Sequence, residues 1–164
     1  MKINLLLNNP NEIRSGYLNI DPFADGSDAR IPGNVNLTNP EEQSLVAKGE
    51  ADEIVAHEIL DYFPAVQVDA LIKTWCEKLA FGGKLVISTV DLEKVCRGVV
   101  FGEFKSILES HQLLYGTQSQ PWEYRKICMP QQVLVQYLQE CGLKILSKTT
   151  ENYRCCVIGV RPNV

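Results

Sequence analysis

The chain has 164 residues, 45% of them hydrophobic, and a formal net charge of −4. A chain of this length can bury a core without disulfides or a metal, and its negative charge gives no reason to expect a nucleic-acid partner. No apolar run approaches the roughly 20 residues of a membrane span, and the first residues do not resemble a signal peptide. We therefore expect a single cytoplasmic domain over residues 1–164, with no nucleic acid or membrane as partner.

The six cysteines do not form a recognisable metal or disulfide motif. No C-x-x-C is present, and no Cys/His pair has zinc-finger spacing. Cysteine is often buried as a small hydrophobic residue. We therefore expect a reduced protein without a metal, in which the cysteines serve mainly as core side chains.

Short apolar runs predict the first strands. Residues 3–7 form one such run, whereas residues 17–21 alternate apolar and polar side chains and end at Asp21. The link between them is short for a parallel crossover, which usually needs about a dozen residues. Either a single helical turn makes the link, or the two strands do not pair. Further strands are predicted at 35–37 and 52–57.

Helix signals alternate with these strands. Asn39-Pro40-Glu41-Glu42 is typical of a helix start, and apolar residues at helical spacing predict a helix over 64–79. Gly82-Gly83 would end that helix. The unbroken apolar run Leu85-Val86-Ile87 then predicts a central strand covered on both faces, as in parallel sheets. Asp91 follows that strand.

The last third predicts two helical regions and a pair of strands. A helical stripe runs from 101 to 114, and Asp91 is a candidate cap for the helix before it. A final helix runs from Pro130 to Gly142, and strands at 143–148 and 153–161 flank a turn at 149–152. The predicted fold class is α/β: a doubly wound sheet, mostly parallel with an antiparallel C-terminal strand, and helices on both faces.

Two longer stretches carry a family resemblance. Residues 52–63 read D-E-I-V-A-H-E-I-L-D-Y-F, and residues 79–87 read L-A-F-G-G-K-L-V-I. They resemble the class I S-adenosylmethionine-dependent methyltransferases, especially small bacterial and phage members with D-E-I-x-A-S-H-x-L-E-H-F and L-K-P-G-G-x-L-x-I-x-x-P-D-L. The similarity extends to residues 17–21, 114–116 and 121–125, in the same order and at similar spacing.

The resemblance implies a Rossmann-like sheet that binds S-adenosylmethionine across the carboxyl ends of its first strands. In this family an acid after the second strand accepts hydrogen bonds from both ribose hydroxyls, and Asp21 matches it. Asn8 falls in the loop that holds the methionine part, Asn36 near the adenine, and His57 on the cofactor or substrate side.

The resemblance also implies a methyl transfer to a small-molecule or sugar-like acceptor. His57 or Asp61 is then the candidate base, and Tyr62, Tyr124 and Arg125 are candidate substrate contacts. Short members of the group lack the extra domain that usually selects the acceptor, so an accessory protein or a homo-oligomer is a possible partner.

The sequence departs from the family in the loop after the first strand. Where the family has L-N-L-G-C-G, this chain has Leu5-Leu6-Leu7-Asn8, without glycine. Glycine allows positive φ and a close approach of the backbone to a ligand. An alternative therefore stays open, in which the fold has lost catalysis and serves as a binding or interaction module.

Overall fold

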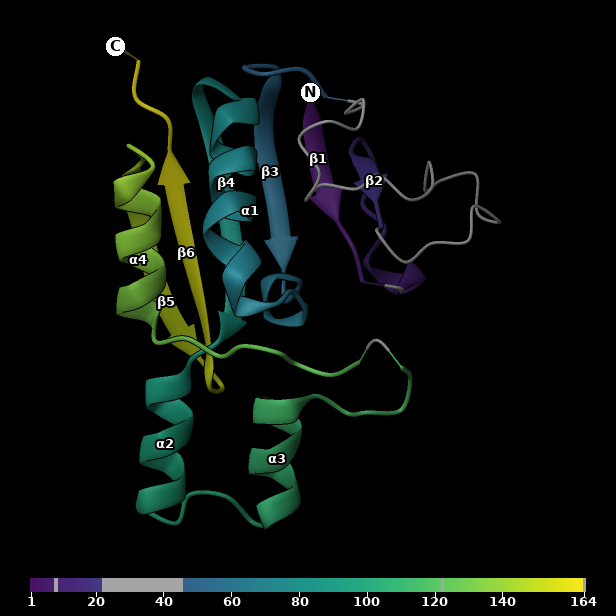
Figure 1. Cartoon of the computed structure of the whole chain (residues 1–164), viewed down its shortest axis with the longest axis vertical. Coiled ribbons are helices and arrows are strands. Elements are labelled where there is room, and N and C mark those ends of the chain that lie inside the picture. Colours follow the sequence, from purple (N-terminus) through teal and green to yellow (C-terminus); the bar gives the residue numbers. More distant parts are fainter. Residues whose placement is uncertain (8, 22–45, 122, 164) are drawn as a thin grey trace.

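The computed structural model describes residues 1–7, 9–21, 46–121 and 123–163. Within these ranges six strands form one sheet in the order β2-β1-β3-β4-β6-β5 (Figure 1). Their bounds are Lys2–Leu5 (β1), Leu18–Ile20 (β2), Ala51–His57 (β3), Leu79–Val90 (β4), Lys144–Glu151 (β5) and Arg154–Val160 (β6).

The sheet is parallel on one side and antiparallel on the other. Strands β2, β1, β3 and β4 pair in parallel, whereas β6 pairs antiparallel with both β4 and β5. The predicted α/β class is therefore confirmed as a mostly parallel sheet flanked by helices, including the antiparallel strand that the closing hairpin adds.

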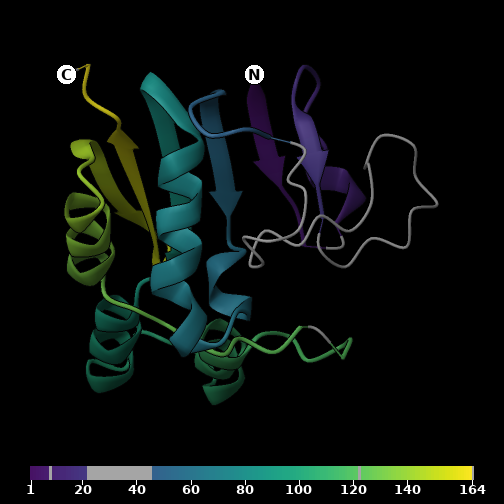
Figure 2. The same ribbon diagram turned by 45° about the horizontal axis from the view of Figure 1, so that its top comes forward.

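Four α-helices accompany the sheet in the described ranges: Ala65–Lys78 (α1), Leu92–Val100 (α2), Ile107–Tyr115 (α3) and Gln131–Glu140 (α4). Helices α1 and α4 cover one face of the sheet, and α2 and α3 lie beyond its carboxyl edge (Figures 1 and 2). None of these helices has the length and apolar character that crossing a bilayer requires.

The core lies between the sheet and helices α1 and α4. Leu85 and Ile87 of β4 are fully buried there, against apolar side chains of α1 that include Leu71 and Ile72. The intervening Val86 is only half-buried. Burial of such side chains contributes about 2 kcal/mol each, which makes β4 the anchor of the sheet.

A single 3₁₀ turn, η1 (Pro10–Glu12), links β1 to β2. The Asn4 side chain of β1 donates to Asn19 Oδ1 of β2 and to the Glu12 carbonyl oxygen, both at 2.9 Å. The backbone N–H of Arg14 donates to the same Asn19 oxygen at 2.9 Å. These bonds hold the short link against the sheet, so the strands do pair, and the helical-turn alternative is confirmed.

Two predicted turns are misplaced. Helix α1 ends at Lys78, within one residue of the predicted 64–79, but Gly82-Gly83 do not end it, because β4 begins at once with Leu79 paired to Ala51. The glycines lie within β4, where the register shifts and a Cβ on Gly83 would come within 2.7 Å of the Ala51 carbonyl oxygen. The closing turn likewise falls at Asn152-Tyr153, later than predicted, because β5 continues to Glu151.

The stripe predicted over 101–114 is helical only from Ile107 onward. Its members are largely exposed, among them Phe101 (73%), Ile107 (75%) and Leu108 (61%). The predicted strand at 35–37 and the helix start at Asn39 lie outside the described residues.

Candidate functional site

Polar side chains gather where the parallel strands end. Asp21 follows β2, His57 is the last residue of β3, and Asp91 follows β4. Because these strands are parallel, the three residues share the carboxyl edge of the sheet, as the sequence predicts. This is the edge at which open α/β sheets bind ligands. Asp21 is 1% exposed, whereas His57 is open to solvent.

Two neighbours fix the orientation of His57. Its Nδ1 hydrogen-bonds with the Ser88 hydroxyl of the adjoining β4. The next residue, Glu58, has φ +49° and donates its backbone N–H to the Ser88 carbonyl oxygen at 2.9 Å. Positive φ in a residue other than glycine is costly and is often found at functional sites. The chain therefore turns sharply at Glu58 and leaves the His57 ring at the rim.

Asp61 follows four residues after His57, in the 3₁₀ turn η2 (Leu60–Tyr62), and is fully buried. The Thr89 hydroxyl donates to its Oδ1, and Arg125 Nη1 and the Val90 N–H donate to its Oδ2, the latter at 3.3 Å. Buried carboxylates are tolerated when they are paired in this way. The Asp61 side chain therefore has three donors and no exposed surface.

The loop that follows α3 is fastened to this turn. The backbone N–H groups of Lys126 and Ile127 both donate to the Asp61 carbonyl oxygen, at 2.7 and 3.2 Å. Arg125 Nη2 donates to Glu58 Oε2 at 2.7 Å, and the Arg125 guanidinium lies 5.2 Å from the centre of the Tyr62 ring. Arg125 thus joins the ends of β3 and η2 to a loop that has no periodic sequence signal.

Glu58 also receives a donor from the closing hairpin, because Arg154 Nε donates to Glu58 Oε1. Four alternating charges therefore stand in a row: Arg154, Glu58, Arg125 and Asp61. The side chains of Arg125 and Asp61 are 5% and 0% exposed, and that of Glu58 is 19% exposed. We call these four residues the charge row.

Burial and pairing act in opposite directions on this row. Burial raises the pKa of the Asp61 carboxyl, an effect that Arg125 and the Thr89 hydroxyl oppose. Burial also disfavours ionised Glu58, but the Arg125 and Arg154 guanidinium groups outweigh it and hold the Glu58 pKa below its ordinary value.

A cavity of about 390 Å³ opens beside the charge row. Its walls come from η2, α3, the loop after α3 and the β5–β6 turn. Lining residues include Tyr62, Phe104, Leu113, Arg125, Tyr153 and Arg154. Of the predicted substrate contacts, Tyr62 and Arg125 therefore lie at the cavity, and Tyr124, 47% exposed, does not line it.

Several residues of the site were not predicted as functional. Glu58 directly follows His57 in a stretch that resembles the family, which was an available signal. Phe104, Tyr153 and Arg154 carried none, because only the folding of the closing hairpin beside α2 and α3 places them here.

The backbone directly after β1 does not adopt the positive φ angles that a glycine loop allows. Leu6 is fully buried and donates its N–H to the Ile20 carbonyl oxygen at 2.8 Å. Neither Leu6 nor Leu7 has a positive φ. The Leu6 side chain therefore stands where the family motif L-N-L-G-C-G has its first glycine. Asp21 follows β2, the position at which that family has its ribose-binding acid. Asn8 and Asn36, the other two predicted cofactor contacts, lie outside the described residues.

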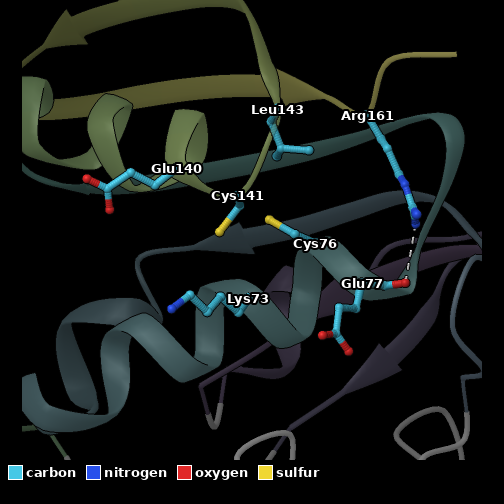
Figure 3. Close-up of a pocket in the computed structure, with 7 residues that line it drawn as sticks. All are labelled: Lys73, Cys76, Glu77, Glu140, Cys141, Leu143 and Arg161. Carbon is cyan, nitrogen blue, oxygen red and sulfur yellow. Dashed lines mark hydrogen bonds between the residues drawn. The ribbon is translucent and has the colours of Figure 1, made fainter. Parts of the chain in front are cut away.

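A second hollow, of about 250 Å³, lies away from this site (Figure 3). The ends of α1, α4 and β6 line it, and Cys76 and Cys141 point toward one another there. Because β4 begins directly after α1, this hollow is at the amino edge of the parallel strands. The described cysteines form no disulfide, and the described residues hold no cluster of His, Cys, Asp or Glu suited to a metal.

Comparison with known proteins finds likeness in structure alone. No protein-family model matches the chain, and no curated protein matches its sequence. Among solved structures, it is similar to a putative methyltransferase of Haloferax volcanii in complex with the Trm112 activator, with a TM-score of 0.65 and 9% identity. That match covers 99% of this chain and 82% of the other.

Two further structures extend this likeness. A 1,6-didemethyltoxoflavin-N1-methyltransferase of Burkholderia thailandensis, solved with S-adenosylhomocysteine, matches with a TM-score of 0.62 and 7% identity, over 99% of this chain and 71% of that one. An O-methyltransferase family protein of Burkholderia thailandensis matches with a TM-score of 0.55 and 17% identity, over 81% of this chain. This chain spans only 36% of that protein's length.

The chain thus has the fold of class I S-adenosylmethionine-dependent methyltransferases. Its polar rim lies at the edge of the sheet where this architecture binds ligands.

Proposed function

We propose that the chain is an S-adenosylmethionine-dependent methyltransferase with a small-molecule acceptor. The observation that carries this proposal is the common carboxyl edge of Asp21 and His57, with a 390 Å³ cavity at the same end of the sheet that η2 and the β5–β6 turn line. A methyl transfer needs a carboxylate that can hold the cofactor ribose and a partly apolar cavity that can hold the acceptor. The likeness to methyltransferase structures supports it.

The acid after β2 is the contact that would hold the cofactor. Asp21 would accept hydrogen bonds from the ribose hydroxyls, since one carboxylate can accept both. When bound, S-adenosylmethionine supplies a methyl group already activated on a sulfonium. The protein then needs only to position the acceptor and take its proton.

His57 is the better placed of the two candidate bases. In the tautomer whose Nδ1–H donates to Ser88, its Nε2 carries a free lone pair at the rim. Asp61 is buried and its oxygens already accept from Thr89, Val90 and Arg125. These contacts favour a positioning role for Asp61, which would hold Arg125 at the cavity.

Calorimetric titration with S-adenosylhomocysteine tests the proposal. We expect saturable binding to the unaltered protein and at least about tenfold weaker binding to Asp21→Asn, because each lost charged hydrogen bond costs about 1.5–3 kcal/mol. Asp69→Asn, on the exposed side of α1, is the matched control and should bind as the unaltered protein does. Absence of binding, or equal binding to both variants, would contradict the proposal.

A second candidate function is a methyltransferase-like module without catalysis. The buried Leu6, in place of a loop glycine, favours it. This module would show no heat with S-adenosylhomocysteine and no rise in melting temperature at saturating ligand, whereas a ligand at 100 times its Kd stabilises a fold by about 2.7 kcal/mol. The same titration therefore separates the two candidates.

A protein partner is part of either proposal. Several apolar side chains of α2, α3 and their connection are exposed: Val99, Val100, Phe101, Ile107 and Leu108. Exposed apolar patches of this kind often mark interaction surfaces. Analytical ultracentrifugation over a concentration series distinguishes self-association, which the purified chain shows alone, from an accessory protein. Phe101→Ser should weaken self-association if this surface mediates it.

A further inference from the structure

The cavity beside the charge row combines flat walls with an unused hydrogen-bond donor. Among the residues that the structure describes, three aromatic rings line it, those of Tyr62, Phe104 and Tyr153. Phe104 and Tyr153 lie with ring centres 4.6 Å apart and planes 33° from parallel. Such walls suit a planar ring, because aromatic groups favour offset stacking or edge contacts.

These walls are held firmly in place. Tyr153 has φ +62° in the β5–β6 turn, its carbonyl oxygen accepts from the Asp91 N–H at 2.9 Å, and its hydroxyl donates to Glu103 at 2.8 Å. A Cβ on Gly98 of α2 would lie 2.8 Å from both rings of the Phe104–Tyr153 pair. The pair is therefore closely packed from behind and presents a fixed surface.

The donor is Arg125 Nε. Among the described residues it has no hydrogen-bond partner, although the Arg125 side chain is only 5% exposed. Its two terminal nitrogens are already bound to Glu58 and Asp61. A buried donor without an acceptor is costly, so an oxygen supplied by a ligand would be favoured here.

Charge decides which kind of oxygen fits. Arg125 and Arg154 are balanced by Glu58 and Asp61 within the charge row. Glu109, on another wall of the cavity, adds a further carboxylate. An anionic ligand would therefore meet no excess of positive charge, whereas a neutral carbonyl or hydroxyl oxygen would satisfy Nε without repulsion.

We infer that the acceptor is a neutral planar aromatic molecule, with its ring between Tyr62 and the Phe104–Tyr153 pair and a carbonyl or hydroxyl oxygen on Arg125 Nε. Glu58 bonds to both arginines of the cavity and directly follows His57, which connects the cavity to the end of β3 that carries the candidate base. This inference rests on the proposed function and adds the chemical class of its substrate.

A matched pair of probes tests it in the absence of cofactor. We would titrate 2-naphthol, which is neutral at pH 7, and 2-naphthoate, which has the same rings and a carboxylate, and follow the amide signals of Thr117 and Asn152 by NMR. Both amides belong to residues that line the cavity. We expect 2-naphthol to bind saturably, and about tenfold more tightly than 2-naphthoate.

Two variants and one control show whether 2-naphthol binds in this cavity. Leu113→Trp, which fills the cavity, should abolish 2-naphthol binding, and Arg125→Lys, which keeps the positive charge but lacks the planar Nε–H, should weaken it about tenfold. Val66→Trp, at a position 90% exposed at the start of α1 and away from the cavity, adds the same side chain and should leave binding unchanged. Circular dichroism checks that each variant is folded. If Arg125→Lys does not fold, binding to Leu113→Trp alone tests the inference.

Equal affinity for the two probes, tighter binding of 2-naphthoate, or undiminished binding to Leu113→Trp would overturn the inference. Its failure is separate from failure of the proposed function, because S-adenosylhomocysteine binding is measured independently. Binding of S-adenosylhomocysteine without 2-naphthol would reject only the acceptor class. Binding of 2-naphthol without S-adenosylhomocysteine would keep the aromatic site and reject methyl transfer.

Discussion

Asp61 and Arg125 are 64 residues apart in the sequence and form an ion pair in which the Asp61 side chain is fully buried. Both residues lie in stretches that resemble the methyltransferase pattern. Asp61 stands at the Glu of D-E-I-x-A-S-H-x-L-E-H-F, and Arg125 closes the stretch 121–125. The ion pair therefore joins two of these stretches in space.

We expect Asp61→Asn to destabilise the fold by about 3 kcal/mol, because it leaves the buried Arg125 guanidinium without its charge partner. Urea unfolding at pH 7 measures this change. Asp69→Asn removes the partner of Lys73 in an exposed ion pair of α1 and should have little effect. Similar midpoints for the two variants would show that the buried pair contributes no more than a surface pair.

The pairing of Glu58 predicts a dependence of stability on pH. Its pKa is lower in the folded protein than in the unfolded chain, where it is about 4.3. The contribution of ionised Glu58 to the free energy of unfolding is therefore complete above about pH 4.3. It is lost as the pH falls below that value toward the folded-state pKa.

Thermal unfolding between pH 7 and pH 3 checks this prediction. Relative to the unaltered protein, Glu58→Gln should be less stable at pH 7, and the difference should narrow as the pH falls below about 4.3. Glu140→Gln, on the exposed end of α4, is the control. A difference between Glu58→Gln and the unaltered protein that stays constant down to pH 3 would argue against the arginine contacts.

Gly98→Ala should destabilise the protein even though Gly98 lies within a helix. Alanine is favoured over glycine in helices by about 1 kcal/mol. Here, however, the added Cβ would come within 2.8 Å of both Phe104 and Tyr153, and overpacking costs about 1–3 kcal/mol. We expect a lower melting temperature and an altered near-ultraviolet circular dichroism signal. A higher melting temperature would show that the Phe104 and Tyr153 rings can move aside for the added methyl group at little cost in stability.

Trp75 of α1 allows a test of an unpaired polar atom in the core. It is 1% exposed, and its Nε1 has no hydrogen-bond partner among the described residues. Trp75→Phe removes this buried donor together with some packing, so we expect a loss well below the roughly 3–5 kcal/mol of Trp75→Ala. Equal losses in urea unfolding would indicate that the indole N–H has an acceptor after all.

Sequence patterns correctly placed Asp21, His57 and Asp91 at the carboxyl ends of strands, but they failed where packing overrides local preference. Gly82-Gly83 is typical of a helix end, yet β4 takes both glycines because Leu79 pairs directly with Ala51. The apolar residues at 101–114 were interpreted as a continuous helical stripe, yet their exposure shows that periodicity alone does not identify a buried face.

The sequence by itself determined the order of strands and helices, the antiparallel closing hairpin and the three polar residues at the strand ends. Apolar runs and caps are local signals, because each depends on neighbours within a few positions. Only the tertiary structure decided that Arg125 meets Asp61 and Glu58, and that Tyr153 and Phe104 form a wall of the cavity. Those contacts join segments far apart in the chain, and the burial and pairing that favour them exist only once the sheet has formed.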